Sequence, residues 1–122
     1  MGYCTVSEQG LILEANLTAA GLLGVARGAL VKQRVARFIV QEDQNLYYHY
    51  HKRLFETGDP QMCELRMVKL HGTAFWARLE ATAAEVAGGA RECRVVITDD
   101  PERERAEQRL RASQERFDQL AE

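Results

Sequence analysis

The sequence predicts an α+β fold in which helices cover one face of a five-stranded antiparallel sheet. Three runs in the second half of the chain alternate apolar with polar residues and are separated by glycine-containing turns, which is typical of antiparallel strands with one buried face. Two shorter apolar runs surround a Ser-Glu-Gln-Gly turn near residue 10, and residues 43–57 have helical periodicity. The resulting order, β-β-α-α-α-β-β-β, fits a single core in a chain of 122 residues.

The first elements follow from turn and cap residues. The stretch YCTVSEQGLILEAN predicts two strands and the turn between them. A short helix is expected in NLTAAGLLG, because Asn16 is a favourable N-cap and Gly24 a favourable end. The next segment is less regular: we expect Gly28 to break it and a helical turn to form near Val35–Ile39.

A longer helix is expected from Asp43 to about Thr57, because Gly58 and Pro60 end it there. At roughly 100° per residue, one arc of this helix is apolar and aromatic and is expected to pack on the sheet. That arc consists of Leu46, Tyr47, Tyr50 and Leu54, with Tyr48, His51 and Phe55 at its margins. His49 lies on the opposite arc and is expected to face water.

Alternation predicts which side chains of the last three strands face the helices. The inward set is Cys63, Leu65, Met67, Phe75, Ala77, Leu79, Ala81, Cys93, Val95 and Ile97. Between the first two of these strands, His71-Gly72 is expected to form a two-residue hairpin turn. The AGGA stretch supplies the turn before the last strand.

The final segment, residues 101–122, predicts a separate helix. Asp100 is a good N-cap, and Pro101 suits the first helical position. A seam of positions then recurs at spacings of four and three, as in a coiled coil, and is weak at Ser113: Ala106, Leu110, Ser113, Phe117 and Leu120. A stripe this narrow needs a partner, so we expect a homodimer through this helix, with Leu110, Phe117 and Leu120 in the contact.

Four stretches, taken in this order and spacing, resemble a PAS sensor domain over nearly all of residues 2–104. They are GLILEANLTAAGLLG, FIVQEDQNLYYHYHKRLFETGDP, ELRMVKLHGTAFWARLEATA and CRVVITDDPERE. They are similar to the family's opening strand and asparagine, its long helix closed by Thr-Gly, its hairpin before Phe-Trp and its closing Asp-Ile-Thr segment. The resemblance implies a non-catalytic PAS domain in residues 1–100 and a C-terminal signalling helix in residues 101–122.

Domains of this kind bind small ligands or prosthetic groups between sheet and helices. They usually precede a histidine kinase or a cyclic-dinucleotide enzyme, so the resemblance implies a downstream output domain in the same protein. In the family, the Asp and Thr of the closing motif help couple the sheet to the output helix. Asp99 is expected to keep this role, whereas Pro101 has no hydroxyl group and His71 replaces the hairpin aspartate of the family.

The residues expected to enclose the ligand pocket are apolar or small, which favours a small apolar or aromatic ligand. They are Phe38, Tyr47, Tyr50, Leu54, Leu65, Met67, Phe75, Ala77, Leu79, Val95 and Ile97. The alternative is that neighbouring side chains fill this space.

The other face of the sheet carries Trp76, Arg78 and Val96, which we expect to meet a partner or a dimer mate. In the family, an amphipathic helix of the same or a partner chain often covers this face. The alternative is a single exposed tryptophan shielded by the stem of Arg78.

Haem and flavin are the alternative ligands. In haem-binding members of the family that this chain resembles, the axial histidine comes from the central helix. The resemblance makes His51 the candidate here. Counted from the Thr-Gly-Asp-Pro end, however, that position falls nearer Tyr47. A metal site is disfavoured because His49 and His51 are two apart and cannot face one ion from a regular helix.

Covalent flavin photochemistry is not expected. The resemblance places Ala36 where light-sensing relatives carry a reactive cysteine. The positions that would hold the flavin edge through amides are Met67, Ala77 and Ile97, and none of these side chains can form a hydrogen bond. A noncovalent flavin is disfavoured for the same reason, and the cofactor is left open: none is favoured, and haem or flavin is the alternative.

Composition excludes further classes. The net charge of −2 gives no basic surface for nucleic acid, and no apolar run is long enough to span a membrane. The three cysteines, Cys4, Cys63 and Cys93, are far apart in apolar stretches and are expected to be reduced core thiols of a cytoplasmic protein. A small enzyme is the alternative from another class, although no nucleophile with a placed base is apparent.

Overall fold

The computed structural model describes residues 1–86 and 88–121, and the side chains of these residues as far as residue 116. Its five strands form one antiparallel sheet in the order β2-β1-β5-β4-β3. The strands are β1 (Gly2–Ser7), β2 (Ile12–Ala15), β3 (Gln61–Val68), β4 (Ala74–Glu85) and β5 (Arg91–Asp99). The helices are α1 (Leu17–Leu23), α2 (Arg27–Leu30), α3 (Gln44–Thr57) and α4 (Pro101–Ala121), with 3-10 turns η1 (Val35–Phe38) and η2 (Gln41–Asp43).

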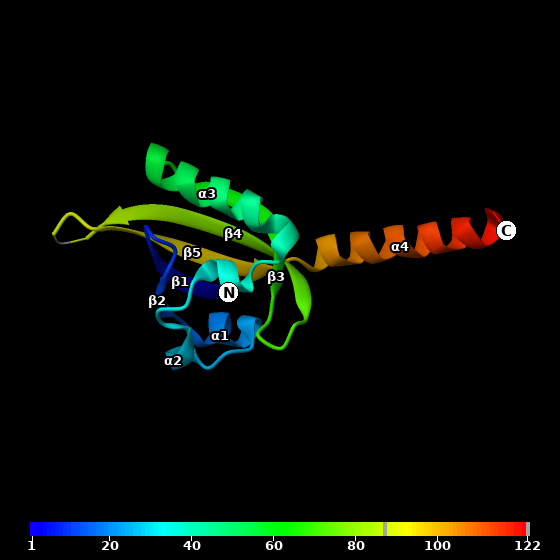
Figure 1. Cartoon of the computed structure of the whole chain (residues 1–122), viewed down its shortest axis with the longest axis horizontal. Helices are drawn as coiled ribbons and strands as arrows, with labels where there is room; N and C mark the ends of the chain where they lie inside the picture. Colours follow the sequence, from blue (N-terminus) through cyan, green and yellow to red (C-terminus); the bar gives the residue numbers. More distant parts are fainter. Residues whose placement is uncertain (87, 122) are drawn as a thin grey trace.

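The predicted fold class and order of elements are confirmed. Strand β1 lies inside the sheet, where Cys4 is paired with Ala15 of β2 on one side and with Val95 of β5 on the other. Figure 1 shows α3 crossing over β4 and β5, α1 and α2 lying together nearer the N-terminus, and α4 projecting away from the domain. The N-terminal segment and the last strand are therefore neighbours, although nearly the whole domain separates them in sequence.

Asn16 begins α1 as expected and also ties it to β1. Its Oδ1 accepts hydrogen bonds from the backbone N–H of Ala19 at 2.9 Å and of Tyr3 at 3.0 Å. Gly24 ends the helix with φ at 69°, which glycine adopts without strain. The expected break at Gly28 is wrong, because this residue lies within the single turn of α2, which is anchored by the buried Leu30.

The hairpin between β3 and β4 differs from the predicted two-residue turn. Lys69 N–H donates to the carbonyl of Thr73, and Gly72 N–H donates to the carbonyl of Lys69, both at 2.8 Å. The loop therefore has three residues, Leu70 to Gly72, with Gly72 at φ 99°. This is the common arrangement of a tight turn followed by a glycine in the left-handed region.

Helix α3 is rotated relative to the expected orientation. Leu46 was expected to pack on the sheet, but 47% of it is exposed, so that prediction is wrong. Phe55, expected at the margin, is buried together with Tyr47, Tyr50 and Leu54. The buried arc is centred near Tyr47 and Leu54, about 100° away from Leu46, because contacts with the sheet set the rotation of the helix.

Candidate functional site

The side chains that alternation assigned to the inner face of the sheet do lie in the core. Leu65, Met67, Ala77, Leu79 and Ile97 are each at most 3% exposed. Of the remaining residues assigned to the pocket, Phe75 is half-buried. The others are buried, namely Phe38, Tyr47, Tyr50, Leu54 and Val95. The helices and the sheet thus enclose a single apolar interior.

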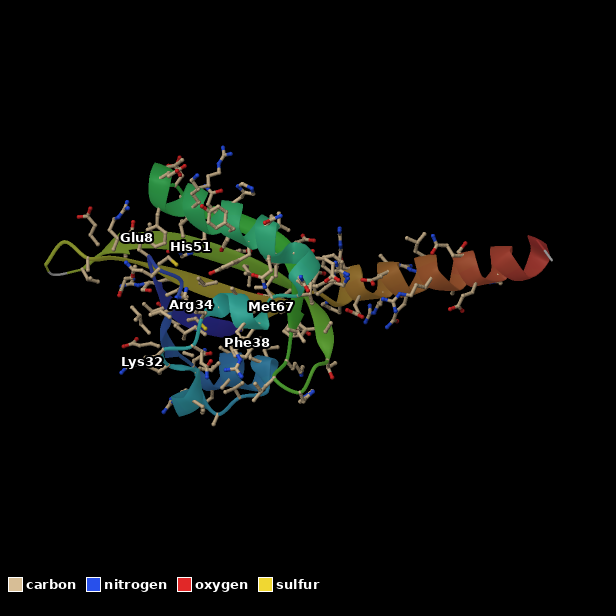
Figure 2. All side chains as sticks on the ribbon, viewed as in Figure 1. Glu8, Lys32, Arg34, Phe38, His51 and Met67 are labelled. Carbon is tan, nitrogen blue, oxygen red and sulfur yellow. The ribbon has the colours of Figure 1, made fainter. Side chains whose placement is uncertain are left out.

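This interior is almost completely filled. Within the described part of the chain, a partly enclosed space of about 10 Å³ lies in this interior, which is at the lower limit for holding one water molecule. Its walls include six of the residues assigned to the pocket, namely Phe38, Tyr47, Met67, Leu79, Val95 and Ile97. Figure 2 labels Phe38 and Met67, which lie close together in the middle of the domain.

The segment that carries Phe38 is held over the sheet by backbone and amide hydrogen bonds. Ile39 forms an antiparallel bridge with Met67, and Val40 N–H donates to the carbonyl of Arg66 at 3.1 Å. The Gln44 amide donates to two carbonyls of this segment, each at 2.7 Å. These hydrogen bonds fix Phe38 in the core. A larger cavity can therefore form only if the segment that carries Phe38 moves.

Tyr50 carries the one buried polar side-chain atom that lacks a hydrogen-bond partner among the described residues. Its hydroxyl group is inaccessible to solvent, and the residue as a whole is 7% exposed. Burial raises the pKa of Tyr50, so the group stays protonated and acts as a donor. An unsatisfied buried donor of this kind costs about 1–3 kcal/mol.

The three thiols are free, and burial makes them unreactive. Cys4 and Cys93 are buried, and Cys63 is half-buried against the core. Burial raises the pKa of Cys4 to about 11. Burial likewise raises the pKa of Cys93 and of Cys63 to about 12. The thiolate, which is the reactive form, is thus scarce at neutral pH.

On the opposite face of the sheet, the start of α4 covers Trp76. The indole Nε1–H donates to the Glu107 carboxylate, and the ring lies 4.6 Å from the Arg103 guanidinium. The backbone of Trp76 also contacts the start of α4. Its N–H donates to Glu104 at 3.4 Å, and its carbonyl accepts from Asp100 N–H at 2.9 Å. The cover expected for this tryptophan comes from the same chain.

Arg66 also lies over the same indole ring, with its guanidinium 5.6 Å from the ring centroid. It also forms a paired hydrogen bond with Asp43, in which Nε donates to Oδ2 and a terminal nitrogen donates to Oδ1, both at 3.3 Å. Asp43 Oδ2 further accepts from Arg66 N–H at 2.7 Å. The hydrogen bond with Asp43 raises the pKa of the guanidinium.

Other residues assigned to the outer face and to the tail lie apart from this contact. Arg78 is paired with Glu64 at 3.2 Å, and Val96 lines an open groove of about 520 Å³ on the outer face. Leu110 is 62% exposed, while Phe117 and Leu120 lie outside the residues whose side chains are described. Asp99 is exposed at the end of β5, whereas the next residue, Asp100, begins α4 by accepting from Arg103 N–H at 3.1 Å.

His51 is placed away from the filled interior, in a surface groove of about 320 Å³. Its Nε2 lies 2.8 Å from the carbonyl of Glu8, and Figure 2 shows the two residues next to each other beside α3. Arg91 completes this cluster by donating to the Glu8 carboxylate and, at 2.7 Å, to the carbonyl of Phe55. The cluster fastens α3 to the β1–β2 turn and to β5.

The residues present do not fit a haem in this conformation. The enclosed space is far too small for a macrocycle, and the one nitrogen of His51 with a described contact lies against a surface carbonyl. Within the described part of the chain, no three His, Cys, Asp or Glu side chains are grouped to hold a metal ion. Nor does any described helix have the length and apolar composition to cross a bilayer.

The sequence pattern did not indicate the contacts that several of these residues make. Asp43 was expected only to begin a helix, yet its carboxylate forms no cap and instead bonds Arg66, which is 23 residues away. Neither Glu104 nor Glu107 was assigned a contact with the sheet from the sequence. Alternation did put Arg66 and Trp76 on the same outer face, which is the one available hint of their contact.

The comparisons with known proteins agree with this geometry. The family profile described as PAS fold matches residues 1–100. Wild-type Cycle PAS-B of Drosophila melanogaster with bound ethylene glycol superposes with a TM-score of 0.76 at 13% identity, covering 82% of this chain and 100% of that one. A PAS domain from a two-component sensor histidine kinase gives 0.70 at 13% identity, covering 81% and 84%.

A third structure, a domain of an HTR-like protein from Haloarcula marismortui, has a TM-score of 0.65 at 20% identity and covers 80% of this chain and 95% of that one. A search of curated proteins gives no match. At these identities, the likeness to solved structures concerns the fold, whereas the profile match covers the whole sheet and the helices packed on it.

Proposed function

The chain belongs to the PAS family, and on this premise we propose that it is the sensory and dimerisation module of a larger cytoplasmic signalling protein, such as a sensor histidine kinase. In this proposal, a ligand or partner signal changes the packing of the domain, and α4 passes the change to an output domain further along the protein. The three free thiols support a reducing compartment.

The observation that carries the proposal is the way α4 leaves the domain. Its first two turns are docked on Trp76 through Glu104 and Glu107, and the remainder projects away from the sheet (Figure 1). Leu110, on the predicted heptad seam, is 62% exposed just beyond the docked part. An exposed leucine at a seam position favours a second copy of the same helix as its partner.

The proposed dimer can be tested by multi-angle light scattering at micromolar concentration. We expect a mass of twice the 13.8 kDa of the chain. Leu110→Glu should shift the protein to monomer, whereas the matched variant Ala112→Glu, which changes the opposite side of α4, should leave the dimer intact. A wild-type monomer that stays monomeric when the helix is extended contradicts the proposal.

A second candidate, binding of a small ligand in the interior, is favoured by the hydroxyl of Tyr50. A ligand with one hydrogen-bond acceptor would satisfy this buried donor, which has no partner among the described residues. Tyr50 does not line the space of about 10 Å³ in the core, so such a ligand must also displace core side chains beside Tyr50. Native mass spectrometry of the freshly purified protein tests this: a retained small molecule that is lost in Tyr50→Phe supports the candidate, and equal retention in both contradicts it.

A further inference from the structure

At residues 66 and 67, strand β3 touches both the interior and the tail helix. Met67 faces inward, is fully buried and lines the enclosed space. Arg66, the preceding residue, faces outward and lies over Trp76. The backbone of this pair also holds the segment before α3, through the bridge from Met67 to Ile39 and the hydrogen bond from Val40 to Arg66. A displacement of that segment therefore acts on both residues at once.

The side chain of Arg66 joins the start of α3 to the tail helix. It is held by both carboxylate oxygens of Asp43, and this pair is partly shielded from water, with 15% of the Asp43 side chain exposed. Its guanidinium also lies over the indole of Trp76, which contacts Arg103 and Glu107 of α4. Planar guanidinium groups suit both a carboxylate pair and an aromatic face.

The junction has room for rearrangement. A groove of about 110 Å³ lies between the β3–β4 edge and α4, and its walls include Arg66, Trp76, Glu104 and Glu107. The negative charge of Glu107 also contributes to the raised pKa of Arg66, so the two groups attract each other. Arg66, held by Asp43, therefore lines the same groove as the two carboxylates of α4 that contact Trp76.

We propose that Arg66 is the coupling residue of this domain: Asp43 at the start of α3 fixes the guanidinium over Trp76, and the state of this pair determines whether the first turns of α4 are docked. This inference rests on the proposed sensory function, because it names the route by which the packing of α3 reaches the tail. It adds Arg66 to Asp99, whose expected part in the coupling stays a prediction.

The experiment uses Trp76, the single tryptophan of the chain, as the reporter. Asp43→Asn removes the charge and keeps an oxygen that can accept from Arg66 N–H. We expect a red-shifted emission, stronger quenching by acrylamide, and at least tenfold faster hydrogen exchange for the amides of residues 103–111. The matched control, Asp59→Asn, changes an exposed aspartate beyond the other end of α3 and should leave all three readouts unchanged.

A second variant, Arg66→Met, keeps an apolar stem over the indole and removes the charge. If Arg66 transmits the effect of Asp43, the double variant should resemble Arg66→Met alone, because the two effects share one route. Wild-type emission and exchange in Asp43→Asn, or fully additive effects in the double variant, would overturn the proposal. Should Asp43→Asn unfold, Arg66→Lys gives the decisive readout: a lysine lacks the paired geometry, so α4 exchange should still accelerate, and wild-type exchange there overturns the proposal.

The emission of Trp76 reports a contact within one chain, and the exchange of residues 103–111 is compared between variants in the same oligomeric state. A monomeric protein in which Asp43→Asn undocks α4 would refute the proposed dimer and leave the coupling intact. A dimer in which Asp43→Asn changes nothing at Trp76 would refute the coupling and leave the proposed dimer intact.

Discussion

Trp76 and Ala77 are consecutive residues of β4 that belong to opposite sides of the sheet. Ala77 is completely buried in the core, while Trp76 lies against Glu104 and Glu107 of α4. The interior and the tail helix are therefore separated by the thickness of one strand. Any change that bends β4 at this point alters both environments.

We expect the core to accommodate only a small side chain at residue 77. Ala77→Leu should lower the free energy of unfolding by about 1–3 kcal/mol, because the added atoms meet an interior with almost no free space. Urea unfolding followed by circular dichroism measures this. Ala74→Leu, at an exposed position of the same strand, is the control, and an equal loss in both variants would contradict the filled interior.

The rotation of α3 can be tested with a pair of leucines on the same helix. Leu54→Ala removes a fully buried side chain and should cost about 2–5 kcal/mol of unfolding free energy. Leu46→Ala removes an exposed one and should change it by no more than about 0.5 kcal/mol. If chemical denaturation gave Leu46→Ala the larger loss, the helix would have the orientation that its sequence pattern first suggested.

Docking of α4 should survive mild acid. The hydrogen bonds from the Trp76 indole and from Arg111 lower the pKa of Glu107 below its ordinary value of 4.5. A carboxyl group with a lowered pKa stabilises the docked state above the ordinary value, and this contribution disappears as the pH falls through the lowered pKa. The emission of Trp76 should accordingly stay constant from pH 7 to about pH 4.5 and shift only below it.

Glu107→Gln serves as the control for this titration. The amide is neutral at every pH, so the acid-dependent shift attributed to Glu107 should be absent. The neighbouring charged groups of the junction are Arg66, Arg103, Glu104 and Arg111. A shift that persists unchanged in the variant would show that Glu107 does not cause it.

The thiols should resist alkylation in the folded protein. Burial raises the pKa of Cys4 to about 11 and that of Cys93 to about 12, so at pH 8 neither forms much thiolate. Both should react with iodoacetamide far more slowly than in urea, and the half-buried Cys63 should be the first to react. Peptide mass spectrometry after timed labelling reads this directly, and rapid labelling of Cys4 in the native protein would contradict its burial.

The same shifts predict how stability depends on alkaline pH. A thiol whose pKa is raised in the folded state keeps its full stabilising contribution below its ordinary pKa of 9.0. That contribution is lost as the pH rises from there through the folded values of about 11 and 12. The melting temperature should therefore fall between pH 8 and pH 11. When each protein is compared with its own melting temperature at pH 8, the fall should be smaller in Cys93→Ala than in the wild type.

Much of the fold was predictable because its signals are local. Alternation in β3, β4 and β5 identifies the inward side chains, since a strand has only two faces. Asn16 and Asp100 were recognised as helix caps for the same reason. The rotation of α3 was predicted less well, because a helical arc shifts by 100° with each residue and its phase is set by the sheet below it.

The candidate site was less accessible to sequence reasoning. Asp43 and Arg66 are 23 residues apart, and Trp76 and Glu107 are 31 apart, so no short-range pattern relates them. Whether an apolar interior is hollow or filled depends on how Phe38 and Met67 fit together, and composition does not contain that information. Charged residues such as Glu104 look like ordinary solvated helix until their partners across the sheet are known.

The position of β1 between β2 and β5 has a consequence for how the chain reaches this structure. Gly2 is paired with Ile97 and Ser7 with Glu92, so the central ladder joins residues synthesised at opposite ends of the domain. Contacts of such long sequence separation slow folding, because a large loop must close before they form. Until the ribosome has released β5, the β1–β2 hairpin has no neighbour on its inner edge, and the nascent domain exposes backbone on which chaperones can act.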